Sequence, residues 1–201
     1  QCGGVNRELI YHFISRGAFD VRGLGPKIID RFMDEGLISD RADMFGLVRG
    51  DIEILDGFGE KSAENIIEEI NRKKTIALPR FLFSLGIHHI GEELSQTVSR
   101  TALGKRRIAA PTDILAAMRA LTSEDLQKIP DIGPAASESI VSWFADAKNA
   151  DLLRRLTAAG VKIVQERIKK GPLAGTSFVL TGALASLSRS EAKDLIRSKG
   201  G

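Results

Sequence analysis

Four short segments of this chain share one pattern, in which an apolar residue precedes a tight turn and a glycine opens an amphipathic helix. They are residues 21–27, 55–61, 87–92 and 129–134, and their last glycines are Gly25, Gly59, Gly91 and Gly133. The first backbone amides of a helix have no partner inside the helix and lie at the positive end of its dipole. Each turn is therefore a suitable site for a phosphate group, and four turns in one chain indicate a surface that binds a polyphosphate backbone.

The composition is that of a globular protein with little charge bias. The chain has 201 residues, of which 43% are hydrophobic and 27% charged, and its net charge is +3. This length suffices for one sizeable domain or two small ones. A solvated surface explains the mild charge as well as a nucleic-acid binding face does. Aromatic residues make up only 5% of the chain, so base stacking is not expected to dominate any contact with nucleic acid.

The cysteine content indicates the cellular compartment, and the two ends of the chain indicate a fragment. A single cysteine, Cys2, excludes an internal disulfide framework and fits a reducing compartment, so we expect a cytoplasmic protein. No apolar run is long enough to span a bilayer, and no signal-peptide pattern opens the chain. The chain lacks a starting Met and stops just after a predicted helix, so we expect a fragment of a longer polypeptide.

Apolar residues recur at helical spacing through residues 5–160. The periodicity predicts helices over residues 5–16, after each of the four turns, and near 79–86, 112–120 and 150–159. Pro26 and Pro134 stand at the first helical position, where a proline costs no hydrogen bond. No segment before residue 160 alternates as a strand would, so this part is predicted to be all-α, with helix–turn–helix units stacked in pairs.

The character of the sequence changes after Gly160. Residues 161–172 are short and charged and are predicted to form a linker. The apolar run Phe178-Val179-Leu180 suggests a buried parallel strand, and Ser188 with Glu191 forms a capping box for the helix that follows. The apolar face of that helix and its stop are expected at Ala192, Leu195, Ile196 and Gly200. A segment of this size cannot bury a full core, so it should pack poorly unless it packs against a neighbouring part of the protein.

The four turns resemble the helix-hairpin-helix motif, in which glycine, an apolar residue and a second glycine are followed four positions later by alanine. Residues 55–63 match this pattern at every position. The other copies depart from it at Ile29, Ser95 and Ser137, which replace the alanine, and at His89 and Asp131, which replace the first glycine. Asp and His tolerate the left-handed conformation of that position better than most residues do.

The order of the segments resembles bacterial NAD-dependent DNA ligases. Residues 12–25 are similar to the stretch that follows the zinc finger of that family, residues 56–63, 85–92 and 129–134 follow in the same order, and residues 178–182 and 199–201 resemble the start of its BRCT domain. The resemblance covers essentially the whole chain and implies a mainly α fold with two paired helix-hairpin-helix units and an incomplete α/β BRCT module. The implied parts are the end of a zinc finger (1–4), the helix-hairpin-helix domain (5–160), the linker (161–172) and the first strand and helix of a BRCT domain (173–201).

The family seals nicks in duplex DNA, in replication and repair, with NAD as the adenylate donor. AMP is loaded on a lysine and passed to the 5′-phosphate before the 3′-hydroxyl closes the phosphodiester. The resemblance thus implies a parent enzyme that uses NAD, zinc and magnesium. The chain contains no K-x-D-G, the nucleophile motif of the family. We therefore expect no catalytic residue and no activity in this segment alone, which would hold DNA as a monomer.

The candidate phosphate-binding residues are Gly23, Gly25, Lys27, Gly57, Gly59, Lys61, Gly91 and Gly133. For a single turn, a helix corner without a ligand is the simpler interpretation. In the first two copies a lysine lies two residues into the helix and can add its charge to the amides, which favours phosphate. Glu60 and Glu92 would repel a phosphate if they pointed inward, so they are expected to face sideways. The fourth turn lacks a basic partner, which leaves a purely structural role open.

Other residues with possible chemistry are weaker candidates. From the sequence alone, Cys2 is an inert terminal thiol. The resemblance matches it to the last cysteine of the ligase zinc finger. Because the three other zinc ligands are missing from this chain, zinc is expected only in the full-length protein. The histidines, His12, His88 and His89, lack metal-ligand spacing and are expected in turn and core roles, the adjacent two pointing in different directions. Residues 59–62 lack the order of a P-loop, and Thr181-Gly182 matches a phosphate position whose basic partner is missing.

Arg100, Lys105, Arg106 and Arg107 form a basic cluster around a predicted loop. Such a cluster is usually a solvated face, but beside four phosphate sites it could extend a DNA track. Two further functions remain open: a scaffold of another repair or recombination protein, and a protein-interaction module in which the turns are only corners. The change of character at residues 178–182 disfavours the first, and a titration with duplex DNA would separate the second.

Overall fold

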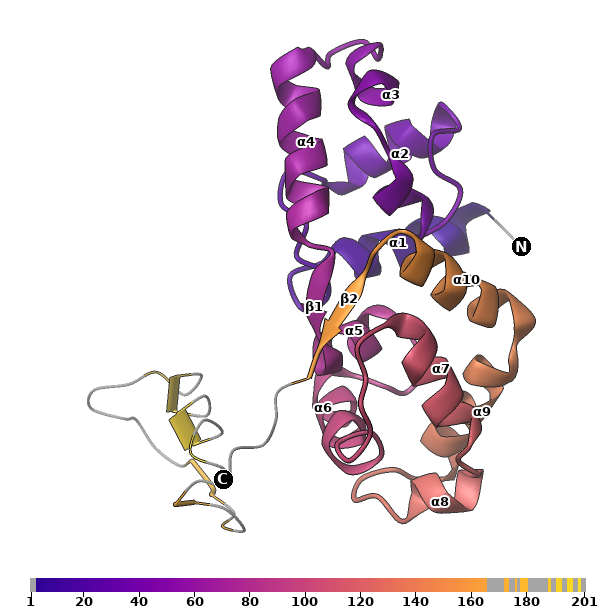
Figure 1. The fold of residues 1–201 in the computed structure, drawn as a ribbon, viewed down its shortest axis with the longest axis vertical. Coiled ribbons are helices and arrows are strands. Elements are labelled where there is room, and N and C mark those ends of the chain that lie inside the picture. Colours follow the sequence, from indigo (N-terminus) through magenta and orange to yellow (C-terminus); the bar gives the residue numbers. More distant parts are fainter. Residues whose placement is uncertain are drawn as a thin grey trace. The chain divides into compact units, whose positions relative to one another are not determined.

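A computed structural model describes residues 3–165 and, beyond them, residues 172–173, 176, 178–180, 188, 191–192, 195–196 and 199. The chain divides into two compact units with the boundary between Gln165 and Glu166, and each is described by itself. The first unit is mainly helical (Figure 1). Its elements are α1 (Gly3–Ile14), α2 (Pro26–Asp34), the 3₁₀ helix η1 (Asp43–Gly46), α3 (Arg49–Glu53), α4 (Glu60–Arg72), β1 (Thr75–Ala77), α5 (Leu78–Ser84), α6 (Glu92–Thr101), α7 (Pro111–Arg119), α8 (Ser123–Gln127), α9 (Pro134–Ala145), α10 (Ala147–Ala158) and β2 (Lys162–Val164).

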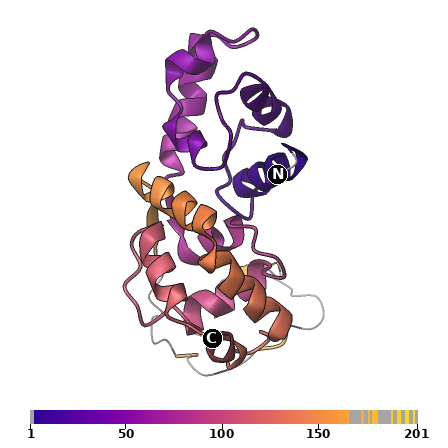
Figure 2. The same ribbon diagram turned by 90° about the vertical axis from the view of Figure 1, so that its right-hand side faces the viewer.

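The helices pack as consecutive pairs, as the repeated turns predicted. α1 packs with α2, α3 with α4, α5 with α6, and α8 with α9, and each pair is joined across one of the four glycine turns. α7 and α10 pack on each other and on α9. Figures 1 and 2 both show α1–α4 and α5–α9 as two groups within this unit, with α10 between them.

The core joins these hairpins through buried apolar faces. The predicted stripes of α2 and α4 are buried at Ile29, Phe32, Ala63, Ile66 and Ile70. The same core contains a cluster of four phenylalanines, Phe13, Phe19, Phe45 and Phe81, whose contacting rings have centroids 4.4 to 6.1 Å apart. Burial of each such side chain stabilises the fold by about 1.5–3 kcal/mol. Because Phe81 lies on α5 and the other three come from residues 13–45, this cluster fixes the third hairpin against the first.

The prediction that residues 5–160 are all helical is wrong at β1. Thr75–Ala77 pairs in parallel with β2, and Ile76 lies opposite Ile163. The prediction of a linker is likewise wrong at Lys162–Val164, which form β2. Each strand is only three residues long, too short to show alternation, and each carries one buried isoleucine. The strands form because they supply each other's hydrogen bonds, and they close the first unit by joining its end to residues after α4.

Two short helices that begin hairpins, α3 and α8, were not predicted. Each has five residues and one buried apolar side chain, Ile52 and Leu126 respectively, so no periodicity is visible. α8 does carry a local signal that could have been found. Thr122 Oγ1 accepts a hydrogen bond from the Asp125 amide (3.1 Å), and Asp125 Oδ2 accepts one from the Thr122 amide (3.2 Å), which is the reciprocal arrangement of a capping box.

The second unit confirms one local prediction and contradicts another. The Ser188 amide donates to Glu191 Oε2 (2.7 Å) and the Glu191 amide donates to Ser188 Oγ (3.2 Å), so the capping box is confirmed. The strand predicted at residues 178–180 is wrong, because they adopt no strand and Val179 is 86% exposed. A strand needs a neighbour for its hydrogen bonds, and the described residues provide none there. The predictions for Cys2, Thr181-Gly182 and Gly200 lie outside the described residues.

Within the described part of the chain, no helix is both long and apolar enough to cross a membrane.

Candidate nucleic-acid interface

All four turns adopt one backbone conformation. The third residue before each helix has a positive φ: +82° at Gly23, +88° at Gly57, +64° at His89 and +65° at Asp131. The tolerance expected of His and Asp at this position is therefore confirmed. The last glycine of each turn is the N-cap of the following helix and is extended, with φ between −109° and −84°. Pro26 and Pro134 begin their helices as predicted.

Buried apolar residues and one hydrogen bond give the last three turns this shape. The amides of Phe58, Ile90 and Ile132 donate to the carbonyls three residues earlier at 3.0 to 3.2 Å. This is the bond of a β-turn, and a positive φ at the third residue identifies type II. The carbonyl belongs in each case to a buried residue, Leu55, Ile87 or Ile129. The turns are therefore held from inside the core, and their outer side faces solvent.

The last glycine of each turn is not required by the chain itself. A Cβ atom placed on Gly25, Gly59, Gly91 or Gly133 would meet no atom of the described part of the chain within 4 Å, and all four glycines are exposed. Their φ values are ones that any residue adopts. Neither packing nor conformation explains these glycines, which leaves the close approach of a ligand to the backbone as a physical reason for them.

Basic side chains accompany the first two turns. Lys27 and Lys61 are exposed at the second position of α2 and α4. Lys61 Nζ lies 3.2 Å from Glu64 Oε2, whereas Lys27 forms no ion pair with a described residue. Glu60 pairs with Arg49 at 2.9 Å, so its carboxylate is neutralised from α3. This agrees with the expectation that Glu60 faces sideways.

A polar network supports the first turn from the second hairpin. Glu69 of α4 is 8% exposed and accepts a hydrogen bond from the Arg22 amide at 3.0 Å. Burial raises the pKa of Glu69, but the bonds from Arg22 and Arg72 and the charge of Lys73 outweigh it and lower that pKa. Lys73 also pairs with Asp20 at 2.9 Å and lowers the pKa of that carboxyl. The first two turns are thereby coupled to one helix.

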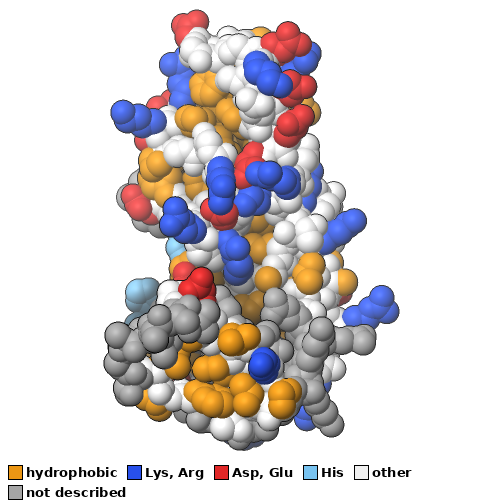
Figure 3. Space-filling model, turned by 90° about the vertical axis from the view of Figure 1, so that its left-hand side faces the viewer, with side chains coloured by type: hydrophobic (Ala, Val, Ile, Leu, Met, Phe, Trp, Pro, Cys, Tyr) orange, Lys and Arg blue, Asp and Glu red, His pale blue; other side chains and the backbone are white. Residues whose placement is uncertain are grey.

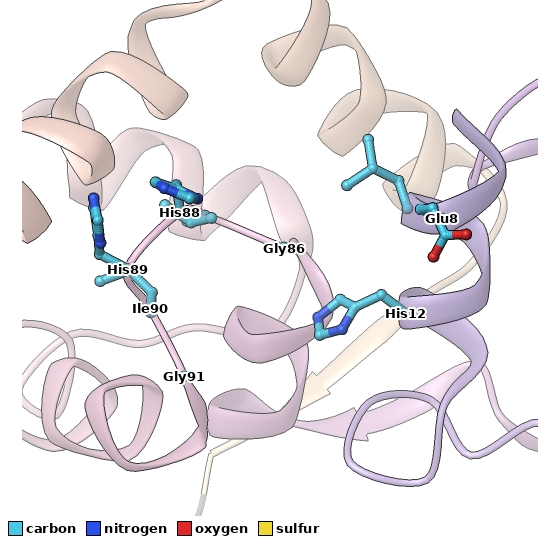
Figure 4. Close-up of a pocket in the computed structure, with 9 residues that line it drawn as sticks. Glu8, His12, Gly86, His88, His89, Ile90 and Gly91 are labelled. Carbon is cyan, nitrogen blue, oxygen red and sulfur yellow. The ribbon is translucent and has the colours of Figure 1, made fainter. Parts of the chain in front are cut away.

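The third turn carries histidines instead of lysine. With α1 it lines a surface depression of about 530 Å³, where Glu8 and His12 lie on the α1 side (Figure 4). His88 and His89 are exposed, and their rings lie 4.2 Å apart, so the prediction that they point in different directions is wrong. His12 packs on Phe83 and its Nε2 lies 2.7 Å from the Phe83 carbonyl oxygen, which agrees with a core role.

The acidic residue that opens the helix after the third turn also faces away from the turn. A Cβ at Gly17 would lie 2.3 Å from Glu92 Oε1, so this carboxylate rests against the loop after α1, as expected. Among the described residues, no group of His, Cys, Asp or Glu is arranged to hold a metal ion.

The fourth turn has the same shape and no basic neighbour of its own. Lys128, the nearest preceding cation in sequence, pairs with Asp125 at 2.8 Å. The Lys128 ammonium, together with the amide and hydroxyl of Thr122, lowers the pKa of Asp125 to about 2. The fourth turn therefore offers a ligand only its exposed backbone amides, next to the exposed Asp131.

Two serines occupy the motif's alanine position with different results. Ser137 Oγ donates to the Pro134 carbonyl oxygen (2.9 Å) and lies 2.9 Å from Ser123 Oγ. Ser95 is fully buried, and its hydroxyl has no hydrogen-bond partner among the described residues. The same substitution is thus satisfied in the fourth hairpin and unsatisfied in the third.

The surface view in Figure 3 shows Lys and Arg side chains gathered about midway along one face, with apolar side chains above and below them. Cations of this kind are what a phosphate backbone attracts, whereas scattered apolar side chains are ordinary for a protein surface.

Comparison with known proteins agrees with this architecture. A family described as a SAM-like helix-hairpin-helix tandem matches residues 16–72, and a family described as a helix-hairpin-helix motif matches residues 80–153. The chain is 42% identical over 201 residues to a DNA ligase of Coxiella burnetii (strain RSA 493 / Nine Mile phase I), covering 100% of the chain. It is 38% identical over 200 residues to a DNA ligase of Desulforudis audaxviator, covering 98%, and 43% identical over 195 residues to one of Trichlorobacter lovleyi, covering 96%.

The chain is a homologue of one segment of DNA ligases. It spans 28%, 28% and 27% of the length of these three relatives. The resemblance to DNA ligases is therefore confirmed, and so is the mainly helical fold with helix-hairpin-helix motifs. The four turns are the joints of those motifs.

Proposed function

We propose that this chain is the part of an NAD-dependent DNA ligase that holds the backbone of nicked duplex DNA without regard to its sequence. The observation that carries the proposal is the open glycine at the start of each helix, which neither packing nor conformation requires. Support comes also from relatives named DNA ligase along the whole chain. They favour this proposal over a scaffold of another repair protein.

The proposed contacts combine backbone amides with two lysines. Phosphate oxygens would accept hydrogen bonds from the amides at the open turns, and Lys27 and Lys61 would add point charges at the first two. The proposed binding residues are Gly23, Gly25, Lys27, Gly57, Gly59, Lys61, Gly91 and Gly133. Amides and lysines recognise phosphate and not base edges, so such contacts position the duplex but carry no sequence information.

The chemistry of sealing would lie in other parts of the parent enzyme. We propose that the parent uses NAD as the adenylate donor together with zinc and magnesium, with Cys2 as one zinc ligand in the full-length protein. Residues 5–160 would be the helix-hairpin-helix domain and residues 173–201 the start of a BRCT domain. The segment would act as a monomer in a cytoplasmic enzyme, and on its own it would bind nicked DNA without sealing it.

The proposal is tested by titrating the chain against a fluorescent nicked duplex at several salt concentrations. Binding should weaken linearly in log Kd against log salt, and duplexes of different sequence should bind alike. Gly59→Val should weaken binding by about tenfold or more, since a side chain would keep phosphate from the amides. Gly46→Val is the matched control, because Gly46 is equally open but lies outside the turns.

Binding that does not respond to salt, or a Gly59→Val variant that binds like the wild type, would count against the proposal. No binding to duplex DNA would favour a protein-interaction module instead.

A further inference from the structure

We propose that the loop after α6 makes a second contact with the nucleic-acid backbone, separate from the glycine turns. This basic loop is defined by Arg100, Lys105, Arg106 and Arg107. The inference rests on the proposed function, because it extends the same duplex contact to a new surface.

The cations of the basic loop form no ion pairs with the described residues of the protein. All four side chains are exposed, and none forms an ion pair with a described residue. The sequence has no Asp or Glu between Glu93 and Asp113. The Asp113 carboxylate is occupied by the amides of Ala109 and Ala110, at 2.8 and 3.0 Å. By contrast, the exposed cations Arg31, Lys61, Lys128 and Arg154 each pair with an acid three or four residues away.

The basic loop is held in place by the backbone around it. A Cβ at Gly104 would lie 2.2 Å from the Arg100 carbonyl oxygen, so the tight turn that ends α6 requires glycine. Gln165 clamps both sides of the loop: its Nε2 donates to the Leu103 carbonyl oxygen at 2.9 Å, and its Oε1 accepts from the Ile108 amide at 3.4 Å. Leu103 and Ile108 are buried. Because the backbone is already ordered, less conformational entropy is lost when a ligand binds.

The basic loop lies one helix length from the third turn. α6 has ten residues, so its two ends are about 15 Å apart. Each strand of a duplex carries one phosphate per 3.4 Å of its axis, so this distance corresponds to about four phosphates. A duplex that reaches from the third turn past the end of α6 therefore offers phosphates to both places.

The chemistry of the loop favours phosphate over an acidic protein. Its arginine side chains present planar forks that match phosphate oxygens in pairs. The loop exposes no aromatic or large aliphatic anchor of the kind that protein interfaces use, since its apolar residues Leu103 and Ile108 are buried.

The experiment compares the salt dependence of duplex binding by the whole chain and by R106Q/R107Q. Each lost phosphate contact should reduce the slope of log Kd against log salt by about 0.9, so a reduction of about 1 to 2 is expected, equal for different DNA sequences. R31Q/R154Q removes the same charge from two arginines that pair with acids and lie outside the glycine turns, and it should leave the slope unchanged. R106K/R107K keeps the charge and should retain most of the slope. Circular dichroism of each variant reports folding.

The outcomes separate this inference from the function on which it rests. If the wild type binds, Gly59→Val weakens binding and R106Q/R107Q has the slope of its control, the inference is overturned and the proposed function stands. If the wild type does not bind duplex DNA, both are overturned. If polyglutamate binds the wild type more tightly than duplex does and R106Q/R107Q loses that binding, the loop serves an acidic partner and the inference is again overturned.

Discussion

The first two glycine turns and the last two share one backbone conformation but carry different side chains. In the first pair, glycine occupies the left-handed position, and a lysine stands at the second residue of the helix. In the second pair, His89 and Asp131 occupy the left-handed position, and Glu93 and Ala135 stand where the lysines were. The final glycine is open in all four turns.

This difference separates what the fold needs from what the proposed ligand needs. Buried apolar residues set the shape, together with a β-turn hydrogen bond in the last three turns, and His or Asp can replace glycine where φ is positive. The open glycine is never replaced, although the chain would accept a side chain there. We therefore expect all four turns to admit a phosphate and the first pair to hold it more tightly, because only that pair adds lysine.

The largest expected effect compares Gly25→Val with Gly133→Val. Both glycines precede a proline and adopt extended φ values that valine accepts, so both variants should fold. Gly25→Val should weaken duplex binding by about tenfold, which is about 1.4 kcal/mol, and Gly133→Val by less than about threefold. Fluorescence anisotropy at one salt concentration measures both. Equal losses would remove the distinction between the two pairs of turns.

The next effect lies within the second pair and concerns its two serines. Ser95→Ala should raise the free energy of unfolding by about 1–2 kcal/mol, because it removes a buried hydroxyl without a partner. Ser137→Ala should lower it by about 1 kcal/mol, because it breaks two satisfied contacts. Urea unfolding of both variants gives the comparison, and a Ser95→Ala protein less stable than the wild type would contradict this account of the third hairpin.

A smaller effect tests the left-handed position itself. Gly57→Ala should lower stability by about 1 kcal/mol, since φ at this residue is +88° and a Cβ is strained there. Asp131→Gly should raise stability by about 0.5 kcal/mol through relief of the same strain. Thermal unfolding measures both changes. If Gly57→Ala were as stable as the wild type, the two pairs would not differ in backbone strain.

The smallest effect concerns a contact between α10 and the first group of hairpins. Arg155 of α10 pairs with Asp40 and Asp43, which precede or begin η1. Burial raises the pKa of Asp43, but hydrogen bonds from Ser39 and the Asp40 amide and the charge of Arg155 bring it below its ordinary value. A carboxyl whose pKa is lowered by folding stabilises the fold above its unfolded pKa of about 3.9 and loses that contribution as pH falls.

Asp43→Asn should therefore lower stability near neutral pH by about 0.5–1 kcal/mol. The difference between wild type and variant should shrink as the pH falls below about 4. Urea unfolding between pH 3 and 7 provides the measurement. A difference that does not change across this range would mean that the Asp43 charge contributes nothing to the contact between α10 and the first group.

The sequence predicted local structure well and long-range contacts poorly. Glycine and proline mark helix starts chemically, so Pro26, Gly59 and the capping box at Ser188 were predictable. β1 and β2 were missed because three residues show no period and their partner lies elsewhere in the chain. The strand predicted at residues 178–180 failed for the related reason that apolar residues alone do not provide a neighbour.

The candidate site follows the same division. The turns and their lysines were visible in sequence, but the isolation of the basic loop from acids and its clamp by Gln165 were not. Gln165 lies 62 residues from Leu103, and Arg155 lies 115 residues from Asp40, and no local pattern links either pair. The tilted contact between the His88 and His89 rings, whose centroids lie 4.2 Å apart, was not predicted either.

The central claim, that amides at the open turns hold phosphates, is tested most directly by backbone amide NMR spectra of the chain titrated with a short nicked duplex. The account predicts the largest shift changes at the amides of Gly25, Lys27, Gly59 and Lys61, with smaller changes at Gly91 and Gly133. Saturable binding in which these amides keep their positions while other surfaces shift would contradict it.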